Sequence, residues 1–403
     1  MKSVSRKAAT YSDAEAQRRL SYFRIAYFKE RRDKIISTIR ELVEIESPSD
    51  NKAAVDRLAE AVAQKFSQLG GDVQIHQAKD FGNHLQVDFP GNPAAKPLML
   101  LGHYDTVYPL GTLATMPCRV VGDKLTGPGV LDMKSGIALM LHALAALQDW
   151  HKEDCHGGLP RPVTVLLVAD EEVGSDSSRA ITESLAKKAA AVLVLEPSYG
   201  PQGAVKTARK GVGEYLVKAT GKAAHAGLDF QKGVNAILEL ARQIEKISSF
   251  TDLKKGLTVN VGVVSGGSRT NVVPAEAAVQ VDVRFARAKD AAGIDKKMHS
   301  LHPFNRKCKI EITGGINRPP MERTAAVAAL YAQAATIARD LGWKLGEAAV
   351  GGGSDGNLTA GLGIPTLDGL GAVGDGAHAS HEHILISELP RRAALIAGLI
   401  ETV

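Results

Sequence analysis

The chain has 403 residues, of which 44% are hydrophobic and 23% are charged. This composition is typical of a globular protein with a large core and excludes a disordered or fibrous chain. The formal net charge of +5 comes from 49 basic and 44 acidic residues. Both signs are interspersed along the whole chain, so the charge gives little reason to expect a nucleic acid as partner.

The sequence predicts a cytoplasmic protein that does not cross a membrane. Its longest apolar runs, such as residues 97–102 and 163–169, are strand-sized and far shorter than the roughly 20 residues of a membrane span. The start of the chain is polar, with no hydrophobic region of a signal peptide. The three cysteines, Cys118, Cys155 and Cys308, form no close pair, which predicts neither disulfides nor a thiolate metal site.

The first half of the chain reads as an α/β sheet. Ser12-Asp13-Ala14-Glu15 is a capping box that opens a helical pattern extending, with a break, toward Ile45. A helix over 53–69 and two short strands, over 73–76 and 84–89, follow. Three continuous apolar runs then have the pattern of strands covered on both faces. They are 97–102, 163–169 and 191–195, separated by helices over 136–147 and 177–188.

The second half changes character twice. From about Val205 it predicts a compact α+β insert, because strands at 213–220, 257–264, 277–285 and 308–313 accompany a helix at 234–247 and one further helix. The α/β pattern then returns, with helices over 324–341 and 390–401 around a glycine-rich turn at 351–356. We therefore expect three parts: an N-terminal helical arm (1–31), a discontinuous main domain (32–205 and 320–403) and an inserted domain (206–319).

Polar residues that suit a metal site follow the predicted strands. In His103-Tyr104-Asp105, side chains two apart point the same way, so His103 can reach a metal while Asp105 fixes its ring. Such a triplet alone is more often a pair of satisfied polar groups. In the loop 127–136, Asp132 suits a bridging carboxylate, although in isolation an N-cap of the following helix is favoured.

Further carboxylates and histidines stand at similar places. Asp170-Glu171-Glu172 follows an apolar strand, and their mutual repulsion calls for a cation or a shared proton unless the loop is solvated. Glu196 ends the next strand, and ligands at the carboxyl ends of neighbouring strands are typical of an α/β active-site crevice. Near the C-terminus, the loop 374–383 holds His378, His381 and His383; His381 and His383 are equally possible ligands, and all three also fit a solvated surface.

Taken together, these motifs resemble the dinuclear zinc peptidases, the family that includes carboxypeptidase G, a glutamate carboxypeptidase. The match runs in order from about Arg32 to the C-terminus; the arm before it departs from the family. The resemblance implies a zinc-exopeptidase-like α/β catalytic domain with a central mixed sheet covered by helices on both faces. It also implies that the smaller inserted α+β domain is a dimerisation or lid domain.

The resemblance also implies the roles of the site residues. Asp132 would bridge two zinc ions, with His103 and Glu196 completing the ligands of one and Glu172 and His378 those of the other. Histidine and carboxylate ligands also permit cobalt or manganese. A hydroxide shared by the ions would be the nucleophile, with Glu171 as general base and Asp105 orienting His103. The family's cis peptide after the bridging aspartate would fall at Asp132-Met133.

Substrate-binding residues are expected mainly in the inserted domain. His225 resembles a family histidine that reaches the neighbouring subunit's active site and stabilises the oxyanion, which would make a homodimer catalytic. Candidates for binding a substrate carboxylate are Asn271, Arg284 and Arg318, with Arg318 preferred and Arg284 read as structural. The backbone of Gly352 and Gly353 is expected beside that carboxylate, because glycine turns bind anions through N–H groups.

The sequence thus predicts a metallopeptidase that cleaves the amide bond of a C-terminal glutamate-type residue or an N-acyl amino acid with a free carboxylate. A sister hypothesis is an N-acyl-amino-acid deacylase of the acetylornithine deacetylase or succinyl-diaminopimelate desuccinylase type. A peptide- or metal-binding protein without catalysis is a third, which the presence of Glu171 disfavours. Nucleic-acid binding is suggested only by the pI and by Lys206, Arg209 and Lys210.

Overall fold

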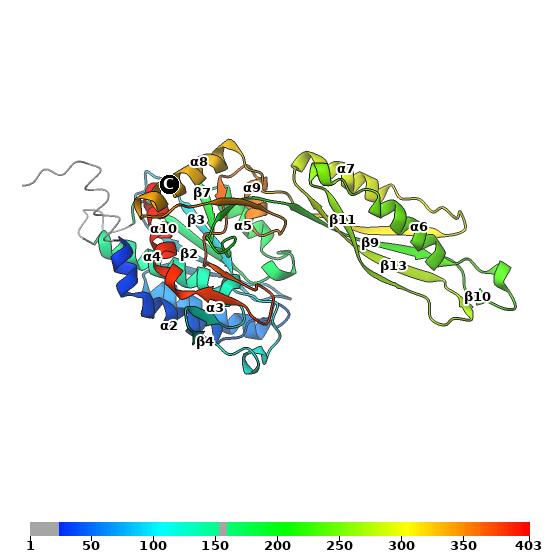
Figure 1. Cartoon of the computed structure of the whole chain (residues 1–403), viewed down its shortest axis with the longest axis horizontal. Coiled ribbons are helices and arrows are strands. Elements are labelled where there is room, and N and C mark those ends of the chain that lie inside the picture. Colours follow the sequence, from blue (N-terminus) through cyan, green and yellow to red (C-terminus); the bar gives the residue numbers. More distant parts are fainter. Residues whose placement is uncertain (1–23, 153–158) are drawn as a thin grey trace, which may run out of the picture. The chain divides into compact units, whose positions relative to one another are not determined.

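The computed structural model describes residues 24–152 and 159–403 (Figure 1). They form two compact units: the first holds the chain up to Thr207 with Thr324–Ala348 and Ile364–Val403, and the second holds Ala208–Arg323 with Ala349–Gly363. The glycine-rich turn at 351–356 thus belongs to the second unit. The sequence analysis had placed it in the main domain, with residues 320–403. The side-chain amide of Asn357 contributes to this grouping, since it donates to the carbonyl oxygens of Lys210 (3.0 Å) and Pro319 (2.7 Å).

Most of the predicted N-terminal arm, including the capping box at Ser12–Glu15, lies outside the described residues. Residues 24–30 are helical, Arg31 forms a turn, and α2 follows over Arg32–Val43. Helix α3 (Lys52–Gln68) begins at Asn51, whose side chain accepts the backbone N–H of Ala54. Such a cap satisfies one of the free N–H groups of the first turn.

The first unit is built on a six-stranded mixed sheet, which confirms the predicted fold class. The strand order is β1 (Asp72–His76), β2 (His84–Phe89), β6 (Val163–Val168), β3 (Leu98–His103), β7 (Ala191–Val194) and β16 (Thr366–Leu367). Strands β6, β3, β7 and β16 run parallel, whereas β1 and β2 are joined antiparallel to each other and to β6.

Helices cover both faces of this sheet, as the alternation within β3 shows. Leu98 and Leu100 belong to the larger core cluster, whereas Met99 and Leu101 pack in a second cluster on the other face. The second cluster includes α5 (Arg179–Ala186). The larger one includes residues of α2, α3, α4 (Ser135–Trp150), α8 (Ala325–Asp340) and α10 (Leu389–Thr402). Burial on both faces explains the uninterrupted apolar run of β3.

One segment of the described chain, Val130–Trp150, is long and apolar enough to span a membrane by length and composition alone. It contains α4, and 83% of its most apolar window is buried inside the structure. Its apolar residues contribute to the larger core cluster beside α2 and α10. The apolar character of α4 is therefore that of a core helix.

The described residues also form short strands that the sequence did not predict. A four-stranded ladder runs in the order β17 (Gly374–Asp375), β18 (His383–Leu385), β5 (Lys124–Thr126) and β4 (Arg119–Val121). Strands β8 (Val205–Arg209) and β15 (Glu347–Val350) form a separate pair. The ladder joins the C-terminal histidine loop to the segment before Asp132.

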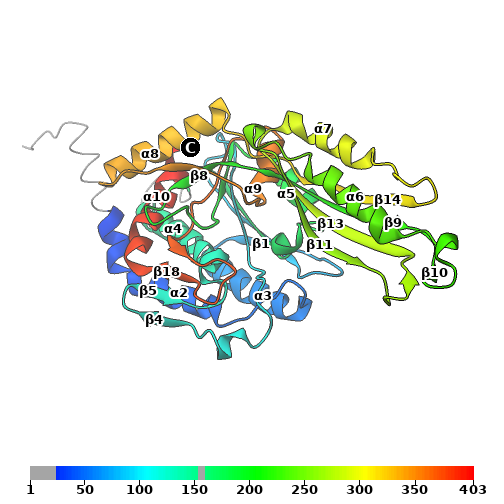
Figure 2. The ribbon, with the colours of Figure 1, turned by 45° about the vertical axis from the view of Figure 1, so that its right-hand side comes forward.

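The second unit contains a four-stranded antiparallel sheet in the order β11 (Thr258–Gly266), β13 (Glu276–Phe285), β9 (Gly211–Thr220) and β14 (Lys309–Arg318). Residues of α6 (Ala236–Ser248) and α7 (Ala288–His299) share its core cluster, and both helices run along the sheet in Figure 2. The pair β10 (Ala224–His225) and β12 (Val272–Val273) and the short helix α9 (Gly356–Gly361) also belong here.

Candidate metal centre

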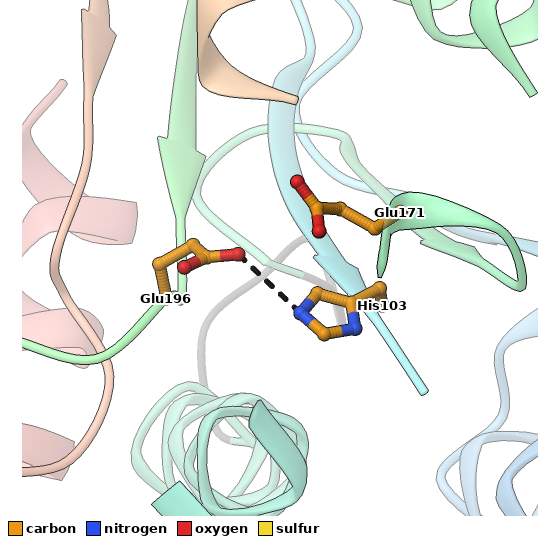
Figure 3. Close-up of side chains that lie close together, drawn as sticks. All are labelled: His103, Glu171 and Glu196. Atoms are coloured by element: carbon orange, nitrogen blue, oxygen red, sulfur yellow. Dashed lines mark ion pairs between the residues drawn. The ribbon is translucent and has the colours of Figure 1, made fainter. Parts of the chain in front are cut away.

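Candidate ligands gather at the carboxyl ends of three adjacent parallel strands. His103 is the last residue of β3, which lies between β6 and β7 in the sheet. The segment after β6 carries Glu171 in a short 3₁₀ helix, and Glu196 follows β7. Figure 3 shows the three side chains pointing toward one another, with Nε2 of His103 3.4 Å from Oε1 of Glu196. The sheet topology itself brings these residues together.

Asp132 lies between two histidines and offers one oxygen to each. Its Oδ1 is 3.1 Å from Nε2 of His103, and its Oδ2 is 3.5 Å from Nε2 of His378. The alternative that Asp132 caps a helix is wrong, because α4 begins at Ser135 and its N-cap position is Lys134. The Asp132-Met133 peptide is cis, as the family resemblance implies. This placement suits a bridging carboxylate.

His378 is the histidine of the C-terminal loop that meets the other candidate ligands. Its Nε2 is 3.1 Å from Oε2 of Glu172, and its backbone has a positive φ of 62°. His383 is turned elsewhere: its Nδ1 lies 2.9 Å from the carbonyl oxygen of His381. Of the alternatives that the sequence left open, the geometry favours His378.

Asp105 connects the two strand ends that carry the ligands. Its carboxylate is fully buried, and Oδ1 lies 3.4 Å from Nδ1 of His103. The same carboxylate accepts the backbone N–H groups of Glu171 (3.3 Å) and Glu172 (3.2 Å). The hydroxyl of Ser49, a residue that the sequence analysis did not single out, also donates to it (2.7 Å). Asp105 is thereby fixed in place beside the imidazole of His103.

The electrostatics of the site reflect many acids around two histidines. Burial lowers the pKa of His103, but hydrogen bonds with Asp105, Asp132 and Glu196 outweigh it and raise this pKa well above its usual value. Burial raises the pKa of Asp132, but hydrogen bonds with His103 and His378 hold it far below the usual range.

Glu172 and His378 form the second interacting pair of the site. Burial raises the pKa of Glu172, partly offset by its hydrogen bond with His378. Hydrogen bonds with Asp132 and Glu172 raise the pKa of His378 to about 10. The carboxylates around the two rings therefore raise the pKa of both histidines.

A divalent cation suits this donor set. Ligand atoms of His103, Glu171 and Glu196 lie within 4.8 Å of one another, as do those of His103, Asp132 and Glu172. Imidazole and carboxylate donors without thiolate bind zinc and also cobalt or manganese. Bound cations would take over the charge compensation that protonated histidines otherwise provide, since metal binding displaces ligand protons.

A small cavity adjoins the ligands. It has a volume of about 290 Å³ and is lined by Glu172 together with mostly small or apolar side chains. Among these, Val107 and Val173 are about half exposed. An organic group bound next to Glu172 would therefore meet both apolar side chains and the polar side chains of Ser49, Asp50 and Thr106.

Two predicted substrate residues of the second unit lie side by side. His225 on β10 pairs with Val272 on β12, and the carbonyl oxygen of Asn271 accepts the backbone N–H of Ala226 (2.9 Å). Nδ1 of His225 accepts the backbone N–H groups of Gly227 (3.1 Å) and Leu228 (3.2 Å). The ring is exposed, and in its neutral form Nε2 carries the proton and can donate it in a hydrogen bond.

The remaining predicted residues of the second unit are held by partners within it. Arg284 donates to the carboxylate of Asp282 at 2.7–3.0 Å, which agrees with its reading as structural. Arg318 is buried in an ion pair with Asp355. Gly353 lies next to it, since a Cβ there would be 3.3 Å from Cδ of Arg318.

Arg209 is a residue near this group that the sequence analysis assigned only to the nucleic-acid alternative. Its guanidinium is buried and donates to the carbonyl oxygens of Gly352 (3.2 Å) and Gly353 (3.0 Å). Arg209 stands two residues before Gly211, where β9 begins. Nothing in this local sequence indicates a contact with Gly352 and Gly353. Arg209, Arg318 and the two glycines thus form one cluster of the second unit.

The sequence matches a known peptidase family over most of its length. The profile of peptidase family M20/M25/M40 matches residues 99–402. Carboxypeptidase G2 of Pseudomonas sp. (strain RS-16) is 32% identical over 377 residues, which cover 91% of this chain and 88% of that protein.

Two solved structures share the fold. Aminopeptidase PepT of Bacillus cereus superposes with a TM-score of 0.73 at 22% identity, covering 92% of this chain and 98% of that one. YXEP of Bacillus subtilis, described as a dinuclear metal-binding peptidase of family M20, has a TM-score of 0.66 at 15% identity, with 93% and 98% covered. These two structural similarities show the fold. The match to the family profile and the relative of 32% identity show the family: the chain belongs to peptidase family M20/M25/M40 and is a metallopeptidase.

Proposed function

We propose that the protein is a dinuclear zinc exopeptidase that hydrolyses the amide bond of a C-terminal glutamate-type residue in a peptide or N-acyl amino acid. The observation that carries the proposal is the position of Asp132 between His103 and His378, with Glu196 and Glu172 beside the two rings. The glutamate preference rests on the similarity to a protein named carboxypeptidase G2.

Glu171 is the residue proposed to move the proton. It shares the site of His103 and Glu196 and follows β6 on a short 3₁₀ helix. Cations held by the five ligands would acidify water and polarise the scissile carbonyl. The Glu171 carboxylate then accepts the proton of the attacking water and delivers it to the leaving nitrogen, so that one acid and one amine are released.

The second unit supplies the proposed substrate contacts. The cluster of Arg318, Arg209, Gly352 and Gly353 is proposed to receive the free carboxylate, with Asn271 as a further polar contact. Asp355 already forms an ion pair with Arg318. The substrate carboxylate would therefore bind the guanidinium of Arg318 together with Asp355. Arginine suits this role through its parallel N–H donors.

His225 is proposed to act on the neighbouring subunit of a homodimer. Two backbone N–H groups bind its Nδ1, which leaves Nε2–H as the donor toward a developing oxyanion. A mixing experiment tests the subunit origin. Dimers of His225→Ala and Glu171→Gln subunits regain one intact site if His225 acts across the interface, so random exchange restores roughly a quarter of the wild-type rate. No recovery in stable mixed dimers would contradict the role.

The substrate class is tested with a panel of N-acyl amino acids and dipeptides, measuring the released amine. We expect release from glutamate conjugates by zinc-restored enzyme and none by metal-free enzyme, with activity returning at two equivalents of zinc. Preference for basic amino acids would instead support a deacylase of the acetylornithine or succinyl-diaminopimelate type. Metal binding without release from any substrate would support a non-catalytic binding protein.

A further inference from the structure

Glu382 is a fully buried carboxylate that the proposed chemistry does not use. It lies four residues after His378, and its side chain reaches across to the loop that carries Asp132. One oxygen, Oε1, accepts the backbone N–H groups of Leu131 (2.7 Å) and Asp132 (2.9 Å), and Oε2 accepts that of Gly129 (2.9 Å). The Glu382 carboxylate is thus held by three backbone hydrogen bonds, which are strong because the acceptor is charged.

The backbone around Glu382 is itself tied to His378. The N–H of Glu382 donates to the carbonyl oxygen of Ala379 (3.0 Å), and the N–H of Ala379 donates to that of Gly376 (2.9 Å). Two consecutive turns, the first of which contains His378, therefore connect His378 to Glu382. The hydroxyl of Tyr108 donates to the carbonyl oxygen of Ala379 (3.0 Å), which fastens the same turns from a third segment.

These contacts link two candidate ligands that are 246 positions apart in the sequence, Asp132 and His378. The Nε2 of His378 is 3.5 Å from Oδ2 of Asp132, and Asp132 also faces His103 through its other oxygen. A displacement of the Asp132 loop relative to the His378 loop would thus change both halves of the site at once.

We infer that Glu382 is a positioning residue that holds the loops of Asp132 and His378 in the arrangement needed to bind two cations. The inference rests on the proposed metal centre but assigns Glu382 no contact with metal or substrate. A carboxylate is required because all three partners are donors. In Glu382→Gln the amide oxygen can replace one carboxylate oxygen, whereas the NH₂ group must face at least one N–H group.

The second unit offers a matched control. Glu239 is also buried, and it accepts the backbone N–H groups of Phe304 (2.9 Å) and Asn305 (2.8 Å). Substituting Glu239 therefore removes a similar carboxylate-to-loop connection in a unit that contains none of the candidate metal ligands. Loss of stability alone should be common to both positions, whereas loss of metal affinity should be specific to Glu382.

The experiment measures zinc dissociation constants of the full-length, metal-free chain by competition with a chelating indicator. Circular dichroism first shows that each variant is folded at the temperature used. We expect Glu382→Ala to bind zinc about 10- to 100-fold more weakly, as when a group that orients a ligand is lost. Glu382→Gln should show a smaller loss, and Glu239→Ala should bind like the wild type. At saturating zinc, the KM of Glu382→Gln should stay near the wild-type value.

Wild-type affinity in Glu382→Ala, or an equal loss in Glu239→Ala, would overturn the inference. If Glu382→Ala does not fold, Glu382→Gln decides, and wild-type affinity in that variant overturns it as well. Failure of the wild-type chain to bind zinc would overturn the proposed metal centre and this inference together, so the two failures are distinguishable.

Discussion

The buried carboxylate of Asp105 accepts the backbone N–H of Glu172 at 3.2 Å. Because its other oxygen lies 3.4 Å from Nδ1 of His103, this one side chain relates a candidate ligand on β3 to a candidate ligand on the segment after β6. Both oxygens of this side chain are engaged: Oδ1 faces Nδ1 of His103 and the N–H of Glu171, whereas Oδ2 accepts from the N–H of Glu172 and the hydroxyl of Ser49.

Asp105→Asn should weaken metal binding while the fold persists. The amide keeps one acceptor oxygen, so its NH₂ group must face either Nδ1 of His103 and the N–H of Glu171 or the N–H of Glu172 and the hydroxyl of Ser49. The lost contacts leave His103 or the segment of Glu172 less firmly oriented, which should lower metal affinity about 10- to 100-fold. Zinc titration of the metal-free protein measures this. Asp88→Asn is the control, because Asp88 accepts from Thr164 (2.6 Å) in the same sheet but contacts no candidate ligand. Unchanged affinity in Asp105→Asn would refute the orienting role.

Glu171→Gln should abolish turnover without emptying the site. The amide cannot accept a proton, so kcat should fall by about 10²- to 10⁴-fold. Metal content should stay the same, because the contact of residue 171 with Asp105 is made by its backbone N–H. Elemental analysis and product release measure the two effects, with Glu183→Gln on α5 as the control of identical chemistry. A near-native rate would rule out Glu171 as the general base.

The sequence predicts the elements whose patterns are local. The apolar runs of β3, β6 and β7 were located within one or two residues because burial on both faces requires such runs. Helix α6 begins at Ala236, two residues later than predicted, since the side chain of Asn235 caps it by accepting from Leu238. The pairing of β18 with β5 escaped prediction, because three-residue strands about 260 positions apart leave no periodic signal.

The candidate site divides in the same way. His103, Glu172 and Glu196 were predictable because each follows an apolar strand, and parallel strands align their carboxyl ends. The residues alone did not distinguish His378 from His381 and His383, since all three stand in one loop, and only the family resemblance selected His378. In the structure its Nε2 lies 3.1 Å from Oε2 of Glu172. Glu382 and Arg209 were missed because their partners are backbone groups of distant segments, which have no signature in the sequence.

Gly371→Ala should disrupt the site through steric conflict. A Cβ at position 371 would lie 2.2 Å from the carbonyl oxygen of Leu195 and 2.7 Å from that of Glu196. Both are backbone atoms and cannot turn away, so the segment carrying Glu196 must shift. We expect weaker zinc binding and a lower thermal unfolding midpoint.

The control for this substitution is Gly293→Ala in α7. A Cβ at Gly293 has nothing within 4 Å, and alanine in a helix interior is favoured over glycine by about 1 kcal/mol. Gly293→Ala should therefore raise the unfolding midpoint and leave zinc affinity unchanged. Equal effects of the two substitutions would contradict the steric argument.

His142 should make folding stability depend on pH below neutrality. Burial, with smaller contributions from Lys34 and Lys65, lowers its pKa to about 4 from the usual 6.5. Between these values the unfolded chain binds a proton that the folded chain does not, so the free energy of unfolding decreases as the pH falls through this window and changes little above it. From pH 7 to pH 5 the free energy of unfolding should fall by about 2 kcal/mol because of His142.

Urea unfolding of metal-free protein at pH 7 and pH 5 tests this. The free energy of unfolding of His142→Gln should fall by about 2 kcal/mol less than that of the wild type over this range. Parallel pH profiles of the two proteins would show that His142 is protonated in the folded state as readily as in the unfolded chain.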